Sequence, residues 1–413
     1  MVSEVQIKTK FKETEVGLIP QDWDVVKLTD IGESIIGLTY SPSNVKKYGT
    51  LVLRSSNIQN GNLAFEDNVY VQMELPQRVI VKENDILICV RNGSRQLIGK
   101  CALIDKKTSG SAFGAFMSIY RSEYSNFVFY QFQSNIILRQ INATLGATIN
   151  QITNKDLASF QIPLPPTKEE QTAIANALND TDKLITQLEK LIAKKQLIKQ
   201  GAMQELLKPK QRWVTKRLNE VIDSFIDYRG VTPKKLGMDW GKGTIPALSA
   251  NNVQMGFIDF EKECYFGSEV LYKRWMRNGD CSKDDIVMTM EAPLGNIAFI
   301  PDNKKYILSQ RTVLLKPSIF LHKVFLRFYL SHSEFQNKLF ENASGSTAKG
   351  IQRKTLEKLE ISFPSDFKQQ EDIAEILLDI ESEISKCEIK LEKFKNIKQG
   401  MMQNLLTGKI RLA

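Results

Sequence analysis

Histidine is almost absent from this sequence of 413 residues, which contains only His322 and His332. These two lie ten positions apart, which is not a metal-ligand spacing. Cysteine is also scarce, and no two of the five cysteines have Cys-x-x-Cys spacing. This scatter argues against a zinc site or a disulfide framework and predicts reduced thiols in hydrophobic cores. The five are Cys89, Cys101, Cys264, Cys281 and Cys387.

Long hydrophobic runs are absent as well. No run approaches the roughly 20 apolar residues that a membrane-spanning helix needs. The first residues, MVSEVQIKTKFKETEVG, contain no apolar signal core. We therefore expect a cytoplasmic protein with no membrane partner.

The motifs of nucleotide-binding and methyl-transferring enzymes are missing. A phosphate-binding loop has four residues between its first glycine and Gly-Lys-Ser/Thr, whereas the stretch from Gly93 to Cys101 has five and ends in cysteine. The sequence contains neither DPPY nor NPPF, which are typical of amino-methyltransferases, and no GxGxxG between a strand and a helix. The acidic residues form no convincing nuclease cluster in linear order. We therefore predict no catalytic site, no metal and no cofactor in this chain.

What the sequence does contain is a duplicated stretch. Residues 146–207 align without a gap to residues 345–406, at a constant offset of 199, and 23 positions are identical. Self-similarity at one fixed offset indicates an internal repeat. The matched positions include Thr148, Ile152, Leu157, Gln171, Ile174, Ala175 and Leu178, which become Thr347, Ile351, Leu356, Gln370, Ile373, Ala374 and Leu377.

The second half of each copy has the apolar spacing of a coiled coil. From Ile373 to Leu405, apolar residues alternate four and three apart with one polar break at Lys398, and Ile174 to Leu206 follows a similar, more polar pattern. This pattern predicts two helices of roughly 38 residues, each about 57 Å long. We expect them to pack against each other in antiparallel orientation. The alternative is that each packs only on its own domain.

The segments before the two helices are also related. Both are rich in expected strands, and equivalent motifs recur at offsets between 190 and 200, so that the loops differ while the helices keep their length. In the first segment, residues 51–65 surround Asn60-Gly61, a dipeptide typical of a hairpin turn. Function carried on variable loops over a rigid frame is a common arrangement.

These observations predict an α+β fold with an internal pseudo-twofold repeat, in which a long antiparallel helix pair separates two similar strand-rich domains. The expected boundaries are 1–165 for an N-terminal arm and the first domain, 166–211 for the first helix, 212–364 for the second domain and 365–413 for the second helix. Residues 1–16 are polar, and we expect them to form an arm.

The net charge of +9 is compatible with a nucleic-acid partner. Residues 17–165 carry 14 basic and 12 acidic side chains, whereas residues 212–364 carry 23 and 17. Most of the excess positive charge therefore lies in the two expected domains and not in the helices.

Polar residues at strand ends are the candidate DNA contacts, because Arg suits guanine edges and Asn or Gln suits adenine edges. Asn57 and Asn252 occupy equivalent repeat positions, so a structural role in an Asx-turn is an open alternative for both. The candidates are Arg54, Ser55, Asn57, Arg91, Asn92 and Arg95 in the first domain, and Arg229, Ser249, Asn251, Asn252, Arg274, Arg277, Thr289 and Glu291 in the second.

A set of motifs occurs in a fixed order along nearly the whole chain. They are GLIPQDWDVVKL near the start, G-x-T-x3-I-x4-L before each helix, PLPPTKEEQTAIANAL at the entry to the first helix, and QGAMQELL and QGMMQNLLTGKIRL at the helix ends. With these ordered, duplicated motifs, the chain resembles a specificity subunit of a type I restriction–modification system. One departure is FPSDFKQQEDIAEIL, which lacks the double proline of its first-copy counterpart and blurs the start of the second helix.

The resemblance implies two target-recognition domains, each reading one part of a split double-stranded DNA target, with the helix pair setting the gap. It also implies two modification (methyltransferase) subunits that use S-adenosylmethionine to methylate adenine, and restriction subunits that use ATP and Mg²⁺ for translocation and cleavage. This chain would then be non-catalytic. Because the loops of the two domains differ, the target should be asymmetric.

Two rival hypotheses belong to other classes. A protein-interaction scaffold would show no DNA sequence preference even with modification subunits present. A fused methyltransferase or nuclease would carry out its chemistry as an isolated chain.

Overall fold

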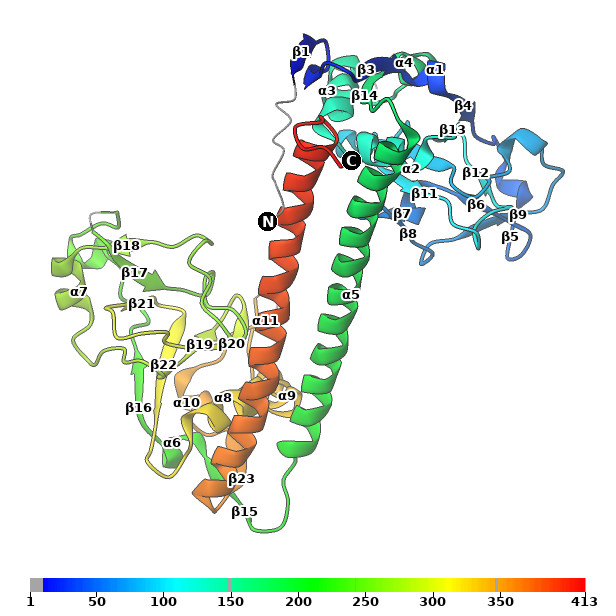
Figure 1. The fold of residues 1–413 in the computed structure, drawn as a ribbon. Helices are drawn as coiled ribbons and strands as arrows, with labels where there is room; N and C mark the ends of the chain where they lie inside the picture. Colours follow the sequence, from blue (N-terminus) through cyan, green and yellow to red (C-terminus); the bar gives the residue numbers. More distant parts are fainter. Residues whose placement is uncertain (1–9, 147–149, 242, 346–347, 413) are drawn as a thin grey trace, which may run out of the picture. The chain divides into compact units, whose positions relative to one another are not determined.

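The computed structural model describes residues 10–146, 150–241, 243–345 and 348–412. The motif residues Thr148 and Thr347 lie outside these ranges. The chain forms two compact units, the first made of residues 1–189 and 389–413 and the second of residues 190–388. Each unit thus contains one strand-rich domain and one half of each long helix (Figure 1).

The domain of the first unit is built on a four-stranded antiparallel sheet of order β11-β10-β13-β4. The domain also contains a second four-stranded sheet of order β12-β6-β9-β5. The strand pairs β1-β2, β3-β14 and β7-β8 complete the domain. The strands are β1 (Phe11–Thr14), β2 (Gly17–Pro20), β3 (Asp24–Lys27), β4 (Gly32–Ile36), β5 (Val45–Lys46), β6 (Thr50–Leu53), β7 (Ile58–Gln59), β8 (Asn62–Leu63), β9 (Val69–Val71), β10 (Ile86–Cys89), β11 (Cys101–Leu103), β12 (Ala112–Phe113), β13 (Met117–Ser122) and β14 (Gln161–Leu164). The helices are α1 (Leu28–Ile31), α2 (Ser125–Phe132), α3 (Asn135–Thr144) and α4 (Asn154–Ser159), with 3-10 turns η1 (Pro42–Asn44), η2 (Ser55–Asn57), η3 (Gln77–Val79) and η4 (Arg95–Leu97).

The domain of the second unit repeats this plan. Its main sheet has the order β20-β19-β22-β16, which matches β11-β10-β13-β4 strand for strand, and β18-β17-β21 forms the smaller sheet. The strands are β15 (Trp213–Arg217), β16 (Ile222–Asp227), β17 (Ile245–Leu248), β18 (Phe266–Gly267), β19 (Ile286–Met290), β20 (Leu294–Phe299), β21 (Ile307–Leu308), β22 (Thr312–Pro317) and β23 (Glu360–Pro364). The helices are α6 (Leu218–Val221), α7 (Glu269–Trp275), α8 (Lys323–Ser331), α9 (Ser333–Glu341) and α10 (Arg353–Leu356), with the 3-10 turn η5 (Lys234–Leu236).

The two long helices are α5 (Lys168–Leu206) and α11 (Phe367–Leu405), each of 39 residues. Within the first unit, Asp182 pairs with Lys398 and Glu189 with Lys395. Residue numbers therefore rise along one helix as they fall along the other, which makes the pairing antiparallel. The second unit shows the same direction, because Lys195 pairs with Glu383 and Lys199 with Glu381. This confirms the predicted orientation within each unit.

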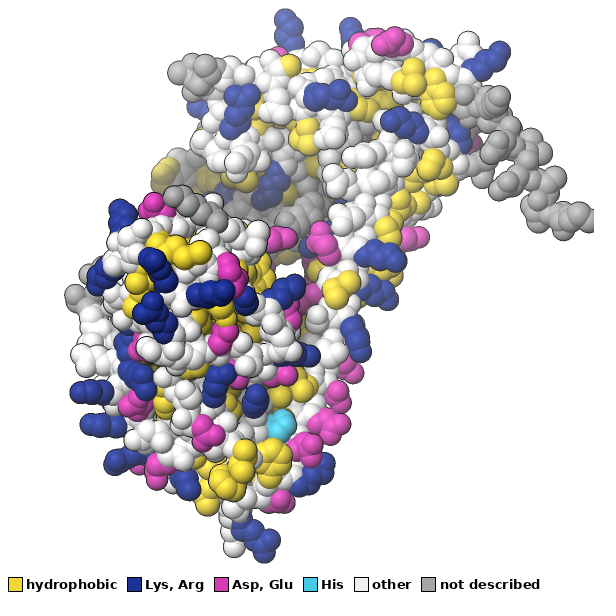
Figure 2. All heavy atoms as spheres, turned by 90° about the vertical axis from the view of Figure 1, so that its left-hand side faces the viewer, with side chains coloured by type: hydrophobic (Ala, Val, Ile, Leu, Met, Phe, Trp, Pro, Cys, Tyr) yellow, Lys and Arg dark blue, Asp and Glu magenta, His cyan; other side chains and the backbone are white. Residues whose placement is uncertain are grey.

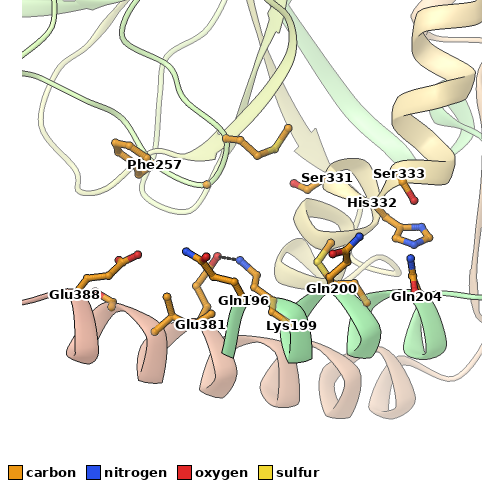
Figure 3. Close-up of a pocket in the computed structure, with 15 residues that line it drawn as sticks. Gln196, Lys199, Gln200, Gln204, Phe257, Ser331, His332, Ser333, Glu381 and Glu388 are labelled. Atoms are coloured by element: carbon orange, nitrogen blue, oxygen red, sulfur yellow. Dashed lines mark hydrogen bonds and ion pairs between the residues drawn. The ribbon is translucent and has the colours of Figure 1, made fainter. Parts of the chain in front are cut away.

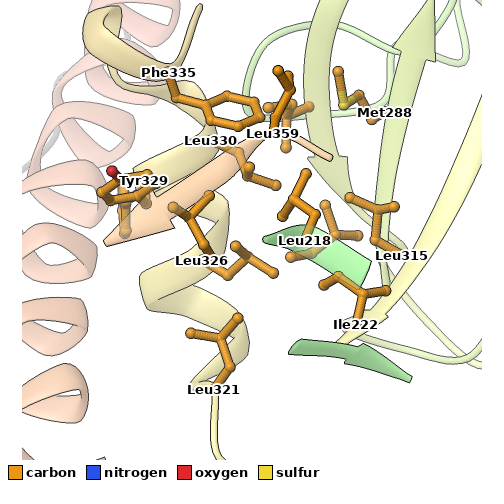
Figure 4. Packing of buried hydrophobic residues seen from close by; sticks show 14 of the residues in the cluster. Leu218, Ile222, Met288, Leu315, Leu321, Leu326, Tyr329, Leu330, Phe335 and Leu359 are labelled. Carbon is orange, nitrogen blue, oxygen red and sulfur yellow. The ribbon is translucent and has the colours of Figure 1, made fainter. Parts of the chain in front are cut away.

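Each domain core is completed by the start of one long helix and the end of the other. Ile174 from the start of α5 and Leu406, just after α11, join the core of the first unit, while Ile373 and Leu207 do the same in the second. Figure 4 shows part of the second core, where Leu326 and Leu330 of α8 face Leu218 and the main sheet. The conserved leucines of the duplicated stretch thus anchor the helix pair to both domains.

Polar side chains fix the helix starts in the same way in both units. Gln171 donates to the carbonyl of Pro165 at 2.8 Å, and its repeat partner Gln370 donates to Pro364 at 2.9 Å. Both glutamines are buried. The same hydrogen bond therefore sets the angle between strand and helix twice, although the second copy lacks the double proline.

Two local predictions have different outcomes. The hairpin around Asn60-Gly61 is confirmed, because β7 and β8 pair on either side and both residues have positive φ. The arm expected over residues 1–16 is wrong in part: Phe11–Thr14 pairs with Gly17–Pro20 as a second hairpin, and Ile19 is buried against the core. The first nine residues lie outside the described ranges.

Two features of composition also have structural counterparts. All five cysteines lie in the described part of the chain and are free thiols, three of them buried, as expected for core residues. Among the described helices, none is long and apolar enough to cross a membrane.

Candidate nucleic-acid interface

A pocket of about 590 Å³ lies in the first domain, where the main sheet and the smaller sheet end together. Three loops form it: the one after β4, the one after β6 and the one before β13. We call it the first pocket. Its wall combines aromatic rings with hydrogen-bonding groups, and the residues used below are Tyr40, Arg54, Ser55, Asp67 and Phe116.

Internal contacts hold the polar groups of the first pocket in place. Arg54 forms an ion pair with Asp67 at 2.8 Å and is about one-third exposed. Asn92, on the loop after β10, donates from Nδ2 to the Ser55 hydroxyl at 3.2 Å, and its Oδ1 accepts from the Ser94 amide. Three of the predicted candidates therefore come together, although Asn92 lies far from Arg54 and Ser55 in the sequence.

Arg91 forms the rim of this pocket. Its guanidinium lies 5.1 Å from the centre of the Phe116 ring, and both side chains are exposed. Arg91 N donates to the Phe116 carbonyl at 3.1 Å, which continues the pairing of β10 with β13. A cation held over an exposed aromatic ring can contact a phosphate or a base edge while the ring stacks on a base.

The second domain has a pocket of about 360 Å³ at the equivalent place, after β16 and β17 and before β22. We call it the second pocket. Ser249 and Asn251 line it, and Asn251 donates to Glu263 at 3.0 Å. Trp240 and Tyr265 form a stacked aromatic wall with ring centres 5.8 Å apart. Two predicted residues and two unpredicted rings thus share this site.

The rim of the second pocket carries different chemistry. Arg311 lines the pocket at the position of Phe116, and Glu291, beside it, occupies the position of Arg91 in the strand pairing. Arg311 Nε and Glu291 Oε1 form an ion pair at 3.0 Å, with both side chains about half exposed. The first domain therefore presents a cation and a ring where the second presents a neutralised ion pair.

The structure corrects three candidates, which are fully buried. Asn57 accepts from the Arg54 amide at 3.0 Å and donates to Ala64 O at 2.9 Å. Asn252 accepts from the Ser249 amide and donates to Ala247 O, each at 2.8 Å. These bonds match the Asx-turn alternative. Thr289 is buried within β19, where its hydroxyl accepts from the Asn296 amide. None of these three side chains can reach DNA from such a position.

Besides Arg91, four predicted arginines are not among the described residues that line either pocket. Arg95 is exposed and donates to Asn142 O, while Arg229 pairs with Asp227 at 2.7 Å and donates to Ile351 O. Arg274 near the end of α7 and Arg277 just beyond it are both exposed. Their positions suit contacts to the sugar-phosphate backbone better than contacts at the pockets.

Sequence reasoning missed the aromatic residues of both pockets. Tyr40, Phe116, Trp240 and Tyr265 were not among the candidates, and neither was Arg311. A signal did exist, because aligning the strand that follows each loop places Phe116 opposite Arg311, immediately before β13 and β22. Both side chains are about half exposed, so neither belongs to a core.

The electrostatic environment favours binding over nucleophilic chemistry. Lys and Arg side chains are spread over the face of the second domain seen in Figure 2, with Asp and Glu among them. Cys89 lies next to the first pocket, and burial raises the pKa of its thiol to about 11. The thiol therefore stays protonated and is not activated as a nucleophile. Burial likewise raises the pKa of the Cys264 thiol.

The sequence was also compared with known proteins. The family described as "Type I restriction modification DNA specificity domain" matches this chain twice, over residues 20–200 and over residues 210–393. The two matches cover the two repeats, including most of both long helices.

Individual relatives and a solved structure are similar to this chain over nearly its full length or over one part of it. The protein assigned as the type I restriction enzyme MjaX specificity subunit of Methanocaldococcus jannaschii is 28% identical, with 97% of each chain covered. The type I restriction enzyme EcoKI specificity subunit of Escherichia coli K12 is 30% identical over 45% of this chain and 40% of its own. The crystal structure of the type I restriction–modification S subunit from M. genitalium has a TM-score of 0.60 at 15% identity, covering 93% of this chain and 96% of that one.

Proposed function

This chain belongs to the family of type I restriction–modification DNA specificity proteins, and we propose that each of its two domains reads one half of a bipartite, asymmetric DNA target. The chain is the non-catalytic specificity subunit of such a system. Recognition is its task, and the chemistry belongs to other polypeptides.

The observation that carries this proposal is the pair of equivalent pockets with unlike rims. Three equivalent loops contribute to both, so both domains can approach DNA with the same surface. Arg91 over Phe116 and Glu291 beside Arg311 then offer different partners to the bases. Arg suits guanine O6 and N7, whereas a carboxylate accepts from cytosine N4. Two unlike half-sites follow from two unlike rims.

We propose a revised set of DNA contacts on this basis. Pocket residues read bases, and the exposed arginines outside the pockets contact phosphates, which adds affinity without sequence preference. The proposed base-reading residues are Arg54, Ser55, Arg91, Asn92 and Phe116 in the first domain, and Ser249, Asn251, Glu291 and Arg311 in the second. The proposed phosphate contacts are Arg95, Arg229, Arg274 and Arg277.

The long helices supply the spacing and the assembly surface in this proposal. Two modification subunits dock on the chain and bring S-adenosylmethionine, and restriction subunits add ATP- and Mg²⁺-dependent translocation and cleavage. The complex works in the cytoplasm on double-stranded DNA. The target adenine must leave the base stack to be methylated, which is the work of the modification subunits.

The test is to map methylated adenines in DNA exposed to the chain assembled with its modification subunits. We expect one motif with two unlike halves separated by a fixed number of unspecified base pairs. A contiguous, symmetric motif would refute the bipartite reading. Methylation without any sequence preference would instead favour a protein-interaction scaffold.

A further inference from the structure

The apolar seam of the helix pair is broken by lysines at two equivalent positions. Lys199 on α5 and Lys398 on α11 are 199 residues apart, the offset of the repeat. Each pairs with an acidic residue of the facing helix, Lys398 with Asp182 at 2.7 Å and Lys199 with Glu381 at 2.6 Å. Asp182 and Glu381 are again 199 residues apart. The duplication has therefore kept one ion pair in each unit.

In the first unit, this ion pair also binds the recognition domain. Lys398 lies 5.7 Å from the centre of the Tyr130 ring and donates to Gln133 Oε1 at 3.3 Å. The Tyr130 hydroxyl donates to the other oxygen of Asp182 at 3.1 Å. Tyr130 is buried at the end of α2, so the contact is held from the domain side as well. We call Asp182, Lys398 and Tyr130 the first clamp.

The second unit has the same arrangement with one additional positive charge, that of Arg327. Lys199 lies 5.7 Å from the centre of the Phe328 ring, and the guanidinium of the buried Arg327 pairs with Glu381. Burial raises the pKa of Glu381, but Arg327 and Lys199 outweigh that effect and hold the pKa below its ordinary value. We call Lys199, Glu381, Arg327 and Phe328 the second clamp.

Figure 3 shows Lys199 and Glu381 of the second clamp at a cavity between the helix pair and the recognition domain of the second unit. The Lys199–Glu381 ion pair crosses from α5 to α11, and Phe257 of the domain lies on the opposite side of the cavity. Gly256, next to Phe257, is close enough that an added Cβ would lie 3.8 Å from Glu381 Oε1. The equivalent Gly61 is 3.5 Å from Gln133 Oε1 by the same measure. The hairpin tip of the second domain thus lies beside Glu381 of its clamp, and the tip of the first domain lies beside Gln133, which accepts from Lys398 of its clamp.

Each unit also contains an ion pair that joins the helices alone. Glu189 and Lys395 pair at 3.3 Å in the first unit, and Lys195 and Glu383 at 2.6 Å in the second. Among the described contacts, none of these four side chains touches a recognition domain. Each unit therefore has one ion pair that joins only the two helices and another that also attaches the recognition domain to the helices.

We propose that the two clamps fix the position of each recognition domain on the helix pair and thereby set which half-site spacing the protein accepts. This inference rests on the proposed function and assigns Lys398 and Lys199 as positioning residues. Neighbouring base pairs are about 3.4 Å apart along DNA, so a small shift of one reading surface changes the accepted spacing by one base pair. A clamp of charges and a ring is directional, whereas the apolar core around it is not.

The test uses the chain assembled with its modification subunits and a DNA library in which the native half-sites are separated by spacers of different length. Lys398→Met keeps the length and apolar stem of the side chain and removes the charge. We expect the ratio of methylation rate on the native spacer to that on a spacer one base pair longer to fall about tenfold, a factor equal to about 1.4 kcal/mol. Lys199→Met should do the same, and base preference within each half-site should not change.

Matched controls come from the helix-only pairs. Lys395→Met and Lys195→Met remove the same charge from the same helices and should leave the spacing ratio unchanged. Asp182→Asn is a milder variant that keeps a hydrogen-bonding group, and it should relax the ratio in the same direction as Lys398→Met. If Lys398→Met and Asp182→Asn change the spacing ratio in the same direction, misfolding of one variant is not the cause.

Two outcomes would overturn the clamps. One is an unchanged spacing ratio in both Lys398→Met and Asp182→Asn. The other is an equal loss of methylation at every spacer length, which would make the clamp a general stabilising element. The wild-type complex is measured in the same assay, and a wild type without any spacing preference would refute the proposed function itself.

Discussion

The rims of the two pockets occupy the same place in their domains and differ most in charge. β10 and β19 end beside β13 and β22 in the same pairing, with Cys89 opposite Met117 and Thr289 opposite Thr312. Two residues beyond Cys89, the first domain has Arg91, and two beyond Thr289 the second has Glu291. A shared backbone frame can therefore carry opposite charges at its edge.

The frame tolerates this difference because its stability lies elsewhere. The strands beneath both rims are buried on both faces, with every residue of β10 and β19 inaccessible. The rim side chains are exposed and contribute little to the cores, since exposed ion pairs are worth only about 0–1 kcal/mol. Recognition can change at such positions without loss of the fold.

Reversing the charge at each rim should have the largest effect on DNA binding. Arg91→Glu should weaken binding of DNA by the assembled complex at least 100-fold, because a carboxylate facing the acceptor edge of guanine and the nearby phosphates costs several kcal/mol. Glu291→Arg should have the opposite effect and strengthen binding at low salt, because it leaves Arg311 unpaired and adds a second cation. Fluorescence anisotropy over a range of salt concentrations measures both.

The control for charge alone is Arg139→Glu. Arg139 lies on α3 of the first domain, where it is exposed and bonds to its own helix. Equal losses of affinity in Arg91→Glu and Arg139→Glu would show that the rim of the first pocket has no special role. Glu291→Arg should also reduce discrimination among second half-sites while leaving the first half-site unaffected.

A smaller effect separates two neighbouring asparagines in the second domain. Asn252→Ala should lower the free energy of unfolding by about 1–3 kcal/mol, because the Ser249 amide and the Ala247 carbonyl lose their partner in the interior. Asn57→Ala should cost as much or more, since Asn57 Nδ2 lies near three acceptors. Chemical denaturation of the two variants measures this.

The matched variant is Asn251→Ala, one residue away and exposed. It should leave stability within about 0.5 kcal/mol of wild type and alter preference at the second half-site. The prediction for Asn252 is that DNA preference stays the same once the variant is folded. If Asn252→Ala changed base preference without loss of stability, its role as a turn residue would be contradicted.

The sequence predicted the repeated parts of the fold well. The 199-residue offset marked both long helices, and their heptad spacing correctly indicated that they pair with each other. The antiparallel orientation was predicted from the domain that lies between them in the sequence. The Asn60-Gly61 hairpin was also predictable from the sequence, because a turn with positive φ at two successive residues favours that dipeptide. Residues 11–14 were misread as an arm, since a short polar strand on the edge of a two-stranded hairpin has almost no apolar signal.

The pockets were only half predictable. Polar residues after strands pointed to Arg54, Ser55 and Asn92, which the structure brings together and whose contacts with DNA stay a prediction. Linear order could not separate Asn251 from Asn252, of which one is exposed and the other buried. The difference depends on whether the side chain folds back to bond its own turn. Phe116 was missed because nothing in its own sequence neighbourhood distinguishes it from a core residue.

The smallest expected difference between the two domains is in the pH dependence of their stability, because both histidines lie in the second domain. Burial lowers the pKa of His322, with Glu371 acting weakly in the opposite direction, and burial lowers the pKa of His332, with Glu334 opposing. Both are neutral in the folded protein at pH 7.5. As the pH falls through about 6.5, the unfolded chain takes up protons that the folded chain does not, so stability is lost with acid.

We therefore expect hydrogen exchange in α8 to speed up between pH 7.5 and pH 6, after correction for the intrinsic rate, by more than in the equivalent α2. His322 caps α8 by accepting from the Phe325 amide through Nδ1, which requires that nitrogen to be unprotonated. His322→Asn keeps an acceptor at this cap and cannot titrate, so it should reduce the difference between the two helices. An α2 that responded to acid as strongly as α8 would show that the histidines are not the cause, because the first domain contains none.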